Sequence, residues 1–84
     1  MWKVITGKPV LRRLVRIPNP DRERLTQAIK DLETKPEHMD IKPLVGRGEY
    51  RLRVGDWRFI LQINEDEKLI RIRSLGSRGD VYKK

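Results

Sequence analysis

The stretch from residue 50 to residue 75 alternates between apolar and polar side chains, with two short turn sequences between the alternating runs. Alternation with a period of two is typical of β-strands that bury one face. Gly55-Asp56 is typical of a two-residue turn, and residues 64–67 (Asn-Glu-Asp-Glu) indicate a second turn. The stretch therefore predicts a meander of three antiparallel strands.

The residues before this meander predict one strand and two helices. Residues 2–6 alternate like a short strand, and apolar residues then recur at helical spacing between Pro9 and Pro18 and again between Pro20 and Pro36. Residues 36–49 hold two prolines and two glycines, which indicates a connecting loop. We therefore expect one α+β domain over residues 1–84, with both helices on one face of a mostly antiparallel sheet.

The turns also predict which residues face one another across the strands. A two-residue turn at Gly55-Asp56 places Arg53 opposite Arg58. A turn centred between residues 65 and 66 then places Arg58 opposite Arg73. Both hairpins assign the same residues to a buried face, and a slip by one residue would destroy this agreement. The predicted buried face consists of Leu52, Val54, Trp57, Phe59, Leu61, Ile63, Ile70 and Ile72.

The opposite face of the predicted sheet gathers arginines. Its members are Arg51, Arg53, Arg58, Arg71 and Arg73, with Ile60 among them. Like charges on neighbouring strands repel one another, and the acidic residues of this region fall in the turns. The pattern favours an anion site on the open face of the sheet, where guanidinium groups can grip phosphates. A solvated basic face remains the alternative.

Composition points to the same kind of partner. The 84-residue chain has a formal net charge of +8, which favours a polyanion as partner. It has no cysteine and a single histidine, His38, so thiolate metal sites, cysteine nucleophiles and multi-histidine metal sites are excluded within one chain. No apolar run approaches the roughly 20 residues of a membrane span, and we expect a soluble, cytoplasmic protein.

Arg12, Arg13 and Arg16 lie on the outer side of the first predicted helix. We interpret this side as a solvated face first and as a contact for RNA phosphates second.

Three motifs carry a resemblance to a known family. They are Lys42-Pro43-Leu44 with Gly46, the run of residues 50–58 (Tyr-Arg-Leu-Arg-Val-Gly-Asp-Trp-Arg), and residues 76–82 (Gly-Ser-Arg-Gly-Asp-Val-Tyr). With these motifs the chain resembles the RelE/ParE toxin superfamily, and within it the RelE-type ribosome-dependent mRNA interferases. The resemblance covers nearly the whole chain, and the fold that it implies agrees with the predicted one.

The resemblance also implies a function. A toxin of this type enters the ribosomal A site and cuts the mRNA codon held there, by attack of a ribose 2′-OH on the adjacent phosphate. It needs no metal and no other cofactor. Its partners are the ribosome (through rRNA), the mRNA and a cognate antitoxin protein that neutralises it, and no membrane is involved.

By position, the resemblance assigns site residues. The catalytic set falls on Arg51, Arg53, Arg58, Arg78 and Tyr82. The expected additional RNA-binding residues are Arg71, Arg73 and Arg47. Arginines can neutralise charge that builds up on a pentacoordinate phosphorus, and a tyrosine can stack on a base.

Two alternatives stay open. The best-known members have lysines where this chain has Arg51 and Arg53, and many have a histidine where it has Ser77. Because arginine keeps its proton, no side chain of this set is an obvious proton acceptor, so a catalytically weakened homologue that binds RNA or antitoxin is one alternative. The other is a ParE-type inhibitor of DNA gyrase, although the motif of residues 50–58 with Arg78 and Tyr82 favours the nuclease.

Overall fold

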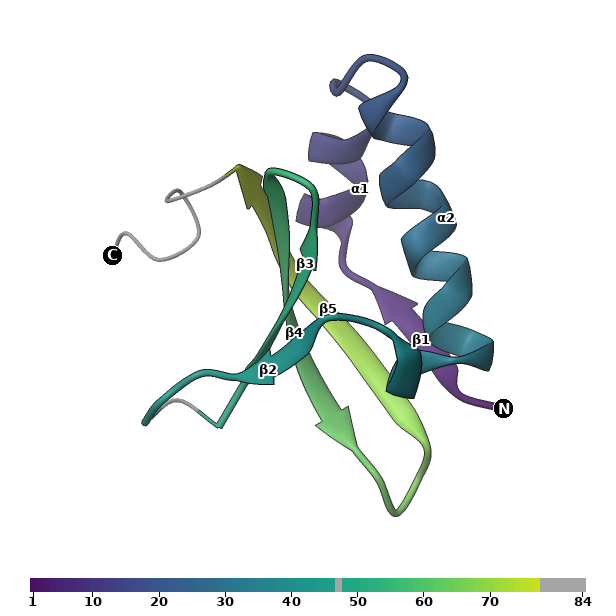
Figure 1. Cartoon of the computed structure of the whole chain (residues 1–84), viewed down its shortest axis with the longest axis vertical. Coiled ribbons are helices and arrows are strands. Elements are labelled where there is room, and N and C mark those ends of the chain that lie inside the picture. The colour runs from purple at the N-terminus through teal and green to yellow at the C-terminus, as the bar shows by residue number, and fades with distance from the viewer. Residues whose placement is uncertain (47, 78–84) are drawn as a thin grey trace.

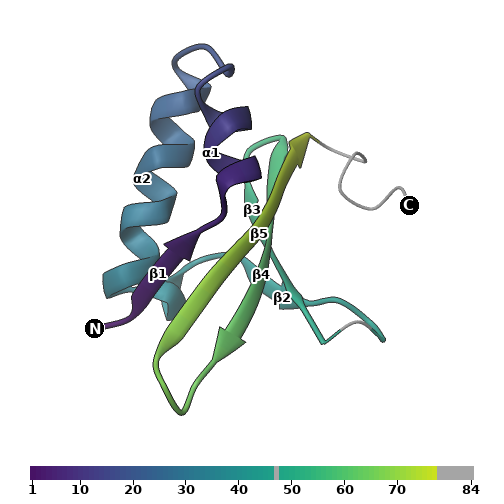
Figure 2. The ribbon, with the colours of Figure 1, turned by 180° about the vertical axis from the view of Figure 1, so that it is seen from behind.

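A five-stranded sheet with two helices on one side forms the part of the chain that the computed structural model describes, residues 1–46 and 48–77 (Figures 1 and 2). The strands lie in the order β1-β5-β4-β3-β2; β1 is parallel to β5 and the other neighbours are antiparallel. The expected α+β class is confirmed. In chain order the elements are β1 (Lys3–Thr6), α1 (Lys8–Leu14), α2 (Asp21–Thr34), the 3-10 turn η1 (Pro36–His38), β2 (Ile41–Pro43), β3 (Tyr50–Val54), β4 (Trp57–Asn64) and β5 (Leu69–Ser77).

The helices bury one stripe each against the sheet. In α2 the buried residues Leu25, Ala28 and Leu32 follow the predicted helical spacing. In the α1 segment only three of the five apolar residues are buried, because Leu11 and Val15 point away from the sheet and are 47% and 68% exposed. Neither helix in the described residues has the length and apolar composition that crossing a bilayer requires.

The β3–β4 hairpin has the predicted register. Arg53 lies opposite Arg58, and Leu52 lies opposite Phe59. Gly55, in the turn, has a φ of 60°, which a glycine adopts without steric cost. Leu52 and Phe59 are 1% and 0% exposed, while Val54, Trp57 and Ile63 are half-buried and pack against the core. The side of the sheet predicted for these residues is therefore confirmed, although three of them are only partly buried.

The β4–β5 hairpin has a different register from the predicted one. Its turn spans four residues, 65–68, and Asn64 opposite Leu69 closes it, with the Asn64 side-chain oxygen accepting a hydrogen bond from the Glu67 backbone N–H at 3.1 Å. Pairing is thereby shifted by two residues, which leaves the buried face unchanged. A bulge then adds Arg73 between the residues that lie opposite Leu61 and Ile60.

The bulge removes one predicted contact. Arg58 lies opposite Gly76 and not opposite Arg73, so the row of three arginines across the sheet is wrong in its third member. The row ends instead at Gly76, which is buried.

The expected loop of residues 36–49 is only partly a loop. It contains η1 and the edge strand β2, in which Ile41 lies opposite Leu52 and Lys42 opposite Arg51. Pro43 is tolerated there because an edge strand has one side without ladder hydrogen bonds. This short strand brings Asp40 and Lys42 beside β3.

Candidate nucleic-acid interface

Three of the predicted catalytic residues lie together on the side of the sheet away from the helices, which we call the open face. Arg51 and Arg53 come from β3 and Arg58 from β4. Each neighbours a buried residue in sequence, Leu52 or Phe59, and alternation along a strand therefore directs the arginines to the opposite side. We call Arg51, Arg53 and Arg58 the arginine cluster.

The members of the cluster differ in burial. The Arg51 side chain is 15% exposed, and the Nε and Nη1 atoms of Arg58 are enclosed by the protein. Arg53 is exposed. Ile60, which lies opposite Arg51 on β4, is 4% exposed. Packing around Arg51 and Arg58 restricts their guanidinium groups to few orientations, while Arg53 keeps its charge in solvent. Positive charges directly opposite on β3 and β4 repel, and an anion bound between them would relieve this repulsion.

Two charged residues that the sequence analysis did not place lie beside the cluster. The Asp40 carboxylate Oδ1 lies 3.5 Å from Arg51 Nη1, and the Asp40 carbonyl oxygen accepts a hydrogen bond from the Arg53 backbone N–H at 3.1 Å. Lys42 lies opposite Arg51. The expectation that no acidic residue neighbours the arginines is therefore wrong, although three arginines and a lysine outweigh one carboxylate.

The predicted RNA-binding residues of β5 lie apart from the cluster. Arg71 is exposed and lies opposite Gln62, four residues along β4 from Arg58, or about 13 Å at the rise of a β-strand. Arg73 is exposed at the bulge. The structure thus places both on the surface of the sheet but outside the cluster. Arg47, Arg78 and Tyr82 lie outside the described residues, so their assignments stay predictions.

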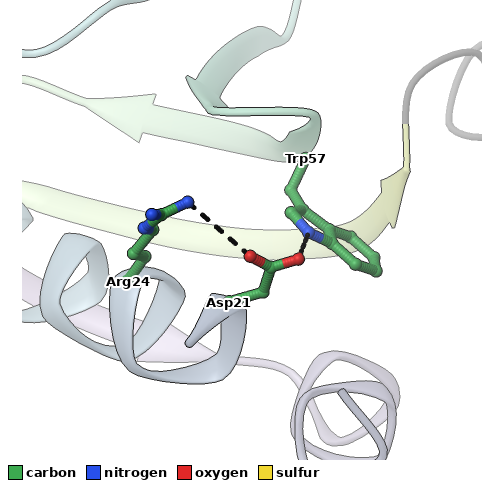
Figure 3. A network of polar contacts seen from close by, with 3 residues as sticks. All are labelled: Asp21, Arg24 and Trp57. Carbon is green, nitrogen blue, oxygen red and sulfur yellow. Dashed lines mark hydrogen bonds and ion pairs between the residues drawn. The ribbon is translucent and has the colours of Figure 1, made fainter. Parts of the chain in front are cut away.

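The start of β4 is tied to the start of α2 by a polar contact. The Trp57 indole Nε1 donates a hydrogen bond to Asp21 Oδ2 at 3.0 Å, and Asp21 Oδ1 lies 3.7 Å from Arg24 Nη1 (Figure 3). Trp57 is half-buried against the core, as its predicted position on the buried face requires. Since Trp57 and Arg58 are consecutive, this contact also fixes the backbone that carries Arg58.

The comparisons with known proteins agree with this fold. The family profile described as "ParE toxin of type II toxin-antitoxin system, parDE" matches residues 8–82. The chain belongs to the RelE/ParE toxin superfamily. It is 35% identical over 86 residues to a RelE1 toxin candidate of Methanocaldococcus jannaschii, an alignment that covers 98% of this chain and 96% of the relative.

Solved structures place this RelE/ParE toxin close to archaeal RelE proteins. The RelE–RelB complex of Pyrococcus horikoshii OT3 contains a chain with a TM-score of 0.79 and 33% identity, matched over 93% of this chain and 96% of that one. The RelB–RelE complex of Methanococcus jannaschii contains one with a TM-score of 0.73 and 26% identity, matched over 93% and 94%. The chain is thus a RelE-like member of the toxins of toxin–antitoxin systems.

The contact between Trp57 and Asp21 is expected to stabilise this RelE/ParE toxin measurably. Replacing Trp57 with phenylalanine keeps an aromatic ring and removes the indole N–H, so we expect the free energy of unfolding to fall by about 1 kcal/mol. Urea unfolding of Trp57→Phe, Asp21→Ala and the double variant measures the coupling between the two side chains. A coupling near zero would contradict the hydrogen bond.

Proposed function

We propose that this chain is the toxin of a type II toxin–antitoxin pair and that it acts as a ribosome-dependent endoribonuclease. In this proposal it cuts mRNA in the ribosomal A site, without a metal, by attack of a ribose 2′-oxygen on the adjacent phosphorus. The bond between that oxygen and phosphorus forms as the bond from phosphorus to the 5′-oxygen of the next nucleotide breaks. The 2′-OH proton is removed, the leaving oxygen takes up a proton, and a 2′,3′-cyclic phosphate remains.

The observation that carries the proposal is the arginine cluster. Negative charge increases on the non-bridging oxygens in the transition state, and fixed positive groups next to them accelerate the reaction. Arg58 and Arg51 are held by packing, and Arg53 faces Arg58 across the two strands. A forked guanidinium group can donate two hydrogen bonds to one phosphate. We assign phosphate binding and charge neutralisation to this cluster.

The residues outside the described part of the chain complete the proposed site. Arg78 follows Ser77, the last residue of β5, and Ser77 lies opposite Trp57 at the same end of the sheet as Arg58. We propose that Arg78 adds a further positive charge at the phosphate and that Tyr82 stacks on a base of the codon. Both assignments rest on the motif positions of the family.

Asp40 is expected to act as a positioning residue for Arg51. Asp40→Asn removes the charge that contacts Arg51 and keeps the backbone carbonyl that holds Arg53. We expect RNA to bind about two- to fivefold more tightly, because the variant no longer repels the RNA phosphates with the Asp40 carboxylate. One such exposed charge interaction is worth roughly 0.5–1 kcal/mol. Cleavage of bound RNA should nevertheless slow several-fold, because Arg51 loses the carboxylate that orients it.

Single-turnover cleavage and RNA titration of this variant measure the two effects separately. Asp40→Glu, which keeps the charge, is the matched control and should stay closer to the wild type in both. Unchanged binding and unchanged cleavage in Asp40→Asn would show that the contact with Arg51 has no part in the reaction.

The proposal includes an antitoxin as partner. The two archaeal relatives were crystallised as complexes of RelE with RelB. A chain with a net charge of +8 and an exposed basic face suits an antitoxin segment that carries acidic residues and covers the arginine cluster. In such a complex the antitoxin would exclude RNA from the site.

Inhibition of DNA gyrase is the second candidate, because the matching family profile is described as a ParE toxin. Primer extension on an mRNA in a purified translation reaction tests the two candidates, with a gyrase supercoiling assay run alongside. We expect cuts within A-site codons that are absent without ribosomes, and unchanged supercoiling. Intact mRNA with inhibited supercoiling would establish the second candidate, and intact mRNA with ribosome binding would establish a non-catalytic homologue.

A further inference from the structure

A second basic site lies on the helix side of the sheet. It is a cleft of about 640 Å³ between α1, the α1–α2 connection and the first residue of β4. Its described lining consists of Pro9, Arg12, Arg13, Arg16, Ile17, Pro18 and Trp57. The volume lies within the range of about 300–1,000 Å³ that is usual for small-molecule sites.

The lining combines positive charge with an aromatic ring. No carboxylate belongs to the described lining, and Arg12 and Arg16 are exposed, four residues apart along α1 and the turn after it. Trp57 contributes the indole; because its Nε1 donates to Asp21, its polar edge is satisfied and its orientation is fixed (Figure 3). A fixed indole bordered by two prolines offers an apolar surface, and the arginines offer charge beside it.

We propose that this cleft binds single-stranded RNA, with a base stacked on Trp57 and phosphates bound by Arg12 and Arg16. The proposal deepens the proposed function and rests on it in one respect: the RNA is the strand that continues from the arginine cluster. Trp57 and Arg58 are neighbours on β4 and point to opposite faces, so a strand that passes the end of β4 reaches both sites. The cleft is then the subsite for nucleotides that flank the cut.

The indole in the lining favours single-stranded RNA over other polyanions. Duplex RNA presents its phosphates and shallow groove to proteins and keeps its bases stacked inside, so it would make no use of the indole. Single-stranded RNA has unpaired bases that stack on aromatic side chains while basic residues follow the backbone. An acidic peptide could use the arginines but not the indole, and decaglutamate serves as the competing probe for this alternative.

Trp57 itself reports binding. In a Trp2→Phe background it is the only tryptophan, and a 2′-O-methylated hexauridylate serves as an RNA probe that cannot be cleaved through a 2′-OH. We expect saturable quenching of Trp57 fluorescence. Arg12→Gln/Arg16→Gln should weaken binding about tenfold, and should lower the slope of log affinity against log salt by about 1.4, or about 0.7 for each lost phosphate contact.

Matched charge removal elsewhere provides the control. Lys30→Gln/Lys35→Gln also removes two positive charges, from exposed positions of α2 and its C-terminal end, and should weaken binding much less. Equal weakening in the two double variants would contradict the subsite and leave only general attraction of a basic protein. Decaglutamate that quenches Trp57 at a lower concentration than the RNA probe would also overturn the proposal, in favour of an acidic peptide.

The experiment separates this proposal from the proposed function. Arg58→Ala should lose cleavage and keep the quenching of Trp57, because Arg58 lies on the other face of β4. A wild-type protein that binds the probe in the cleft and never cuts mRNA would refute the nuclease and keep single-stranded RNA binding at the cleft. A protein that cuts mRNA, with a KM unchanged in Arg12→Gln/Arg16→Gln, would refute the subsite and keep the nuclease.

Discussion

Replacing Arg58 with alanine is expected to slow mRNA cleavage by about 100-fold or more, because removal of one preorganised group that stabilises developing charge commonly costs that much. Arg58 is the best placed member of the arginine cluster, since its Nε and Nη1 atoms are enclosed and its position opposite Arg53 is fixed by the hairpin. Single-turnover cleavage on ribosomes carrying a defined A-site codon measures the effect. Binding of the toxin to the ribosome should change by a much smaller factor.

Two further variants make the result specific. Arg71→Ala removes an exposed arginine from the same sheet, about 13 Å along β4 from Arg58, and should slow cleavage less than about fivefold. Arg58→Lys keeps the positive charge and loses the forked pair of donors, so its cleavage rate should lie between those of the wild type and Arg58→Ala. Equal rates for Arg58→Ala and Arg71→Ala would contradict a localised phosphate site.

Replacing Phe59 with alanine is expected to remove about 3–5 kcal/mol of stability. Phe59 is 0% exposed and lies on the central strand β4 among Leu52, Leu75 and the helices, so its loss leaves a cavity that its neighbours cannot fill. A domain of this size has a total stability of roughly 4–13 kcal/mol, so the variant could be largely unfolded. Urea unfolding followed by circular dichroism measures the change.

Phe59→Leu gives a result even where the alanine variant does not fold. Leucine fills most of the site, and we expect a loss of about 1–2 kcal/mol. Val45→Ala is the surface control: Val45 is 98% exposed, and the change should stay within about 0.5 kcal/mol. A loss below 0.5 kcal/mol for Phe59→Ala would contradict its place in the core.

The sequence predicted the β3–β4 hairpin down to its residue pairs for a local reason. A two-residue turn at Gly55 leaves only one pairing that also buries Leu52 and Phe59, and the structure has that pairing. The arginine cluster follows from the same alternation. The positions of Arg51, Arg53 and Arg58 on one face could therefore be predicted without a structure.

The β4–β5 hairpin could not be predicted in the same way. A turn over residues 64–67 and a turn over residues 65–68 both keep the alternation of buried side chains, because the two pairings differ by two residues, and the hydrogen bond from the Glu67 N–H to the Asn64 side chain belongs to the second. The bulge at Arg73 has no sequence signature of its own, because both flanking residues suit a strand. The predicted contact between Arg58 and Arg73 failed for these two reasons.

Asp40 and Lys42 were missed because two prolines and two glycines suggested a loop throughout residues 36–49. The alternation Asp40-Ile41-Lys42 was the available indication, but three residues are too few to distinguish a strand from a loop. Pairing with β3 decides the matter, and this pairing is a tertiary contact that no local pattern reveals.

The central claim is that the arginine cluster serves a reaction in which a ribose 2′-OH attacks the neighbouring phosphate. An mRNA with one 2′-deoxynucleotide on the 5′ side of the cut, placed in the A site of purified ribosomes, tests it most directly. We predict that cleavage at that bond is abolished, that the toxin still binds, and that the unmodified mRNA is cut to leave a 2′,3′-cyclic phosphate. Cleavage of the deoxy-substituted bond at the normal rate, or no cleavage of the unmodified mRNA, would contradict the account.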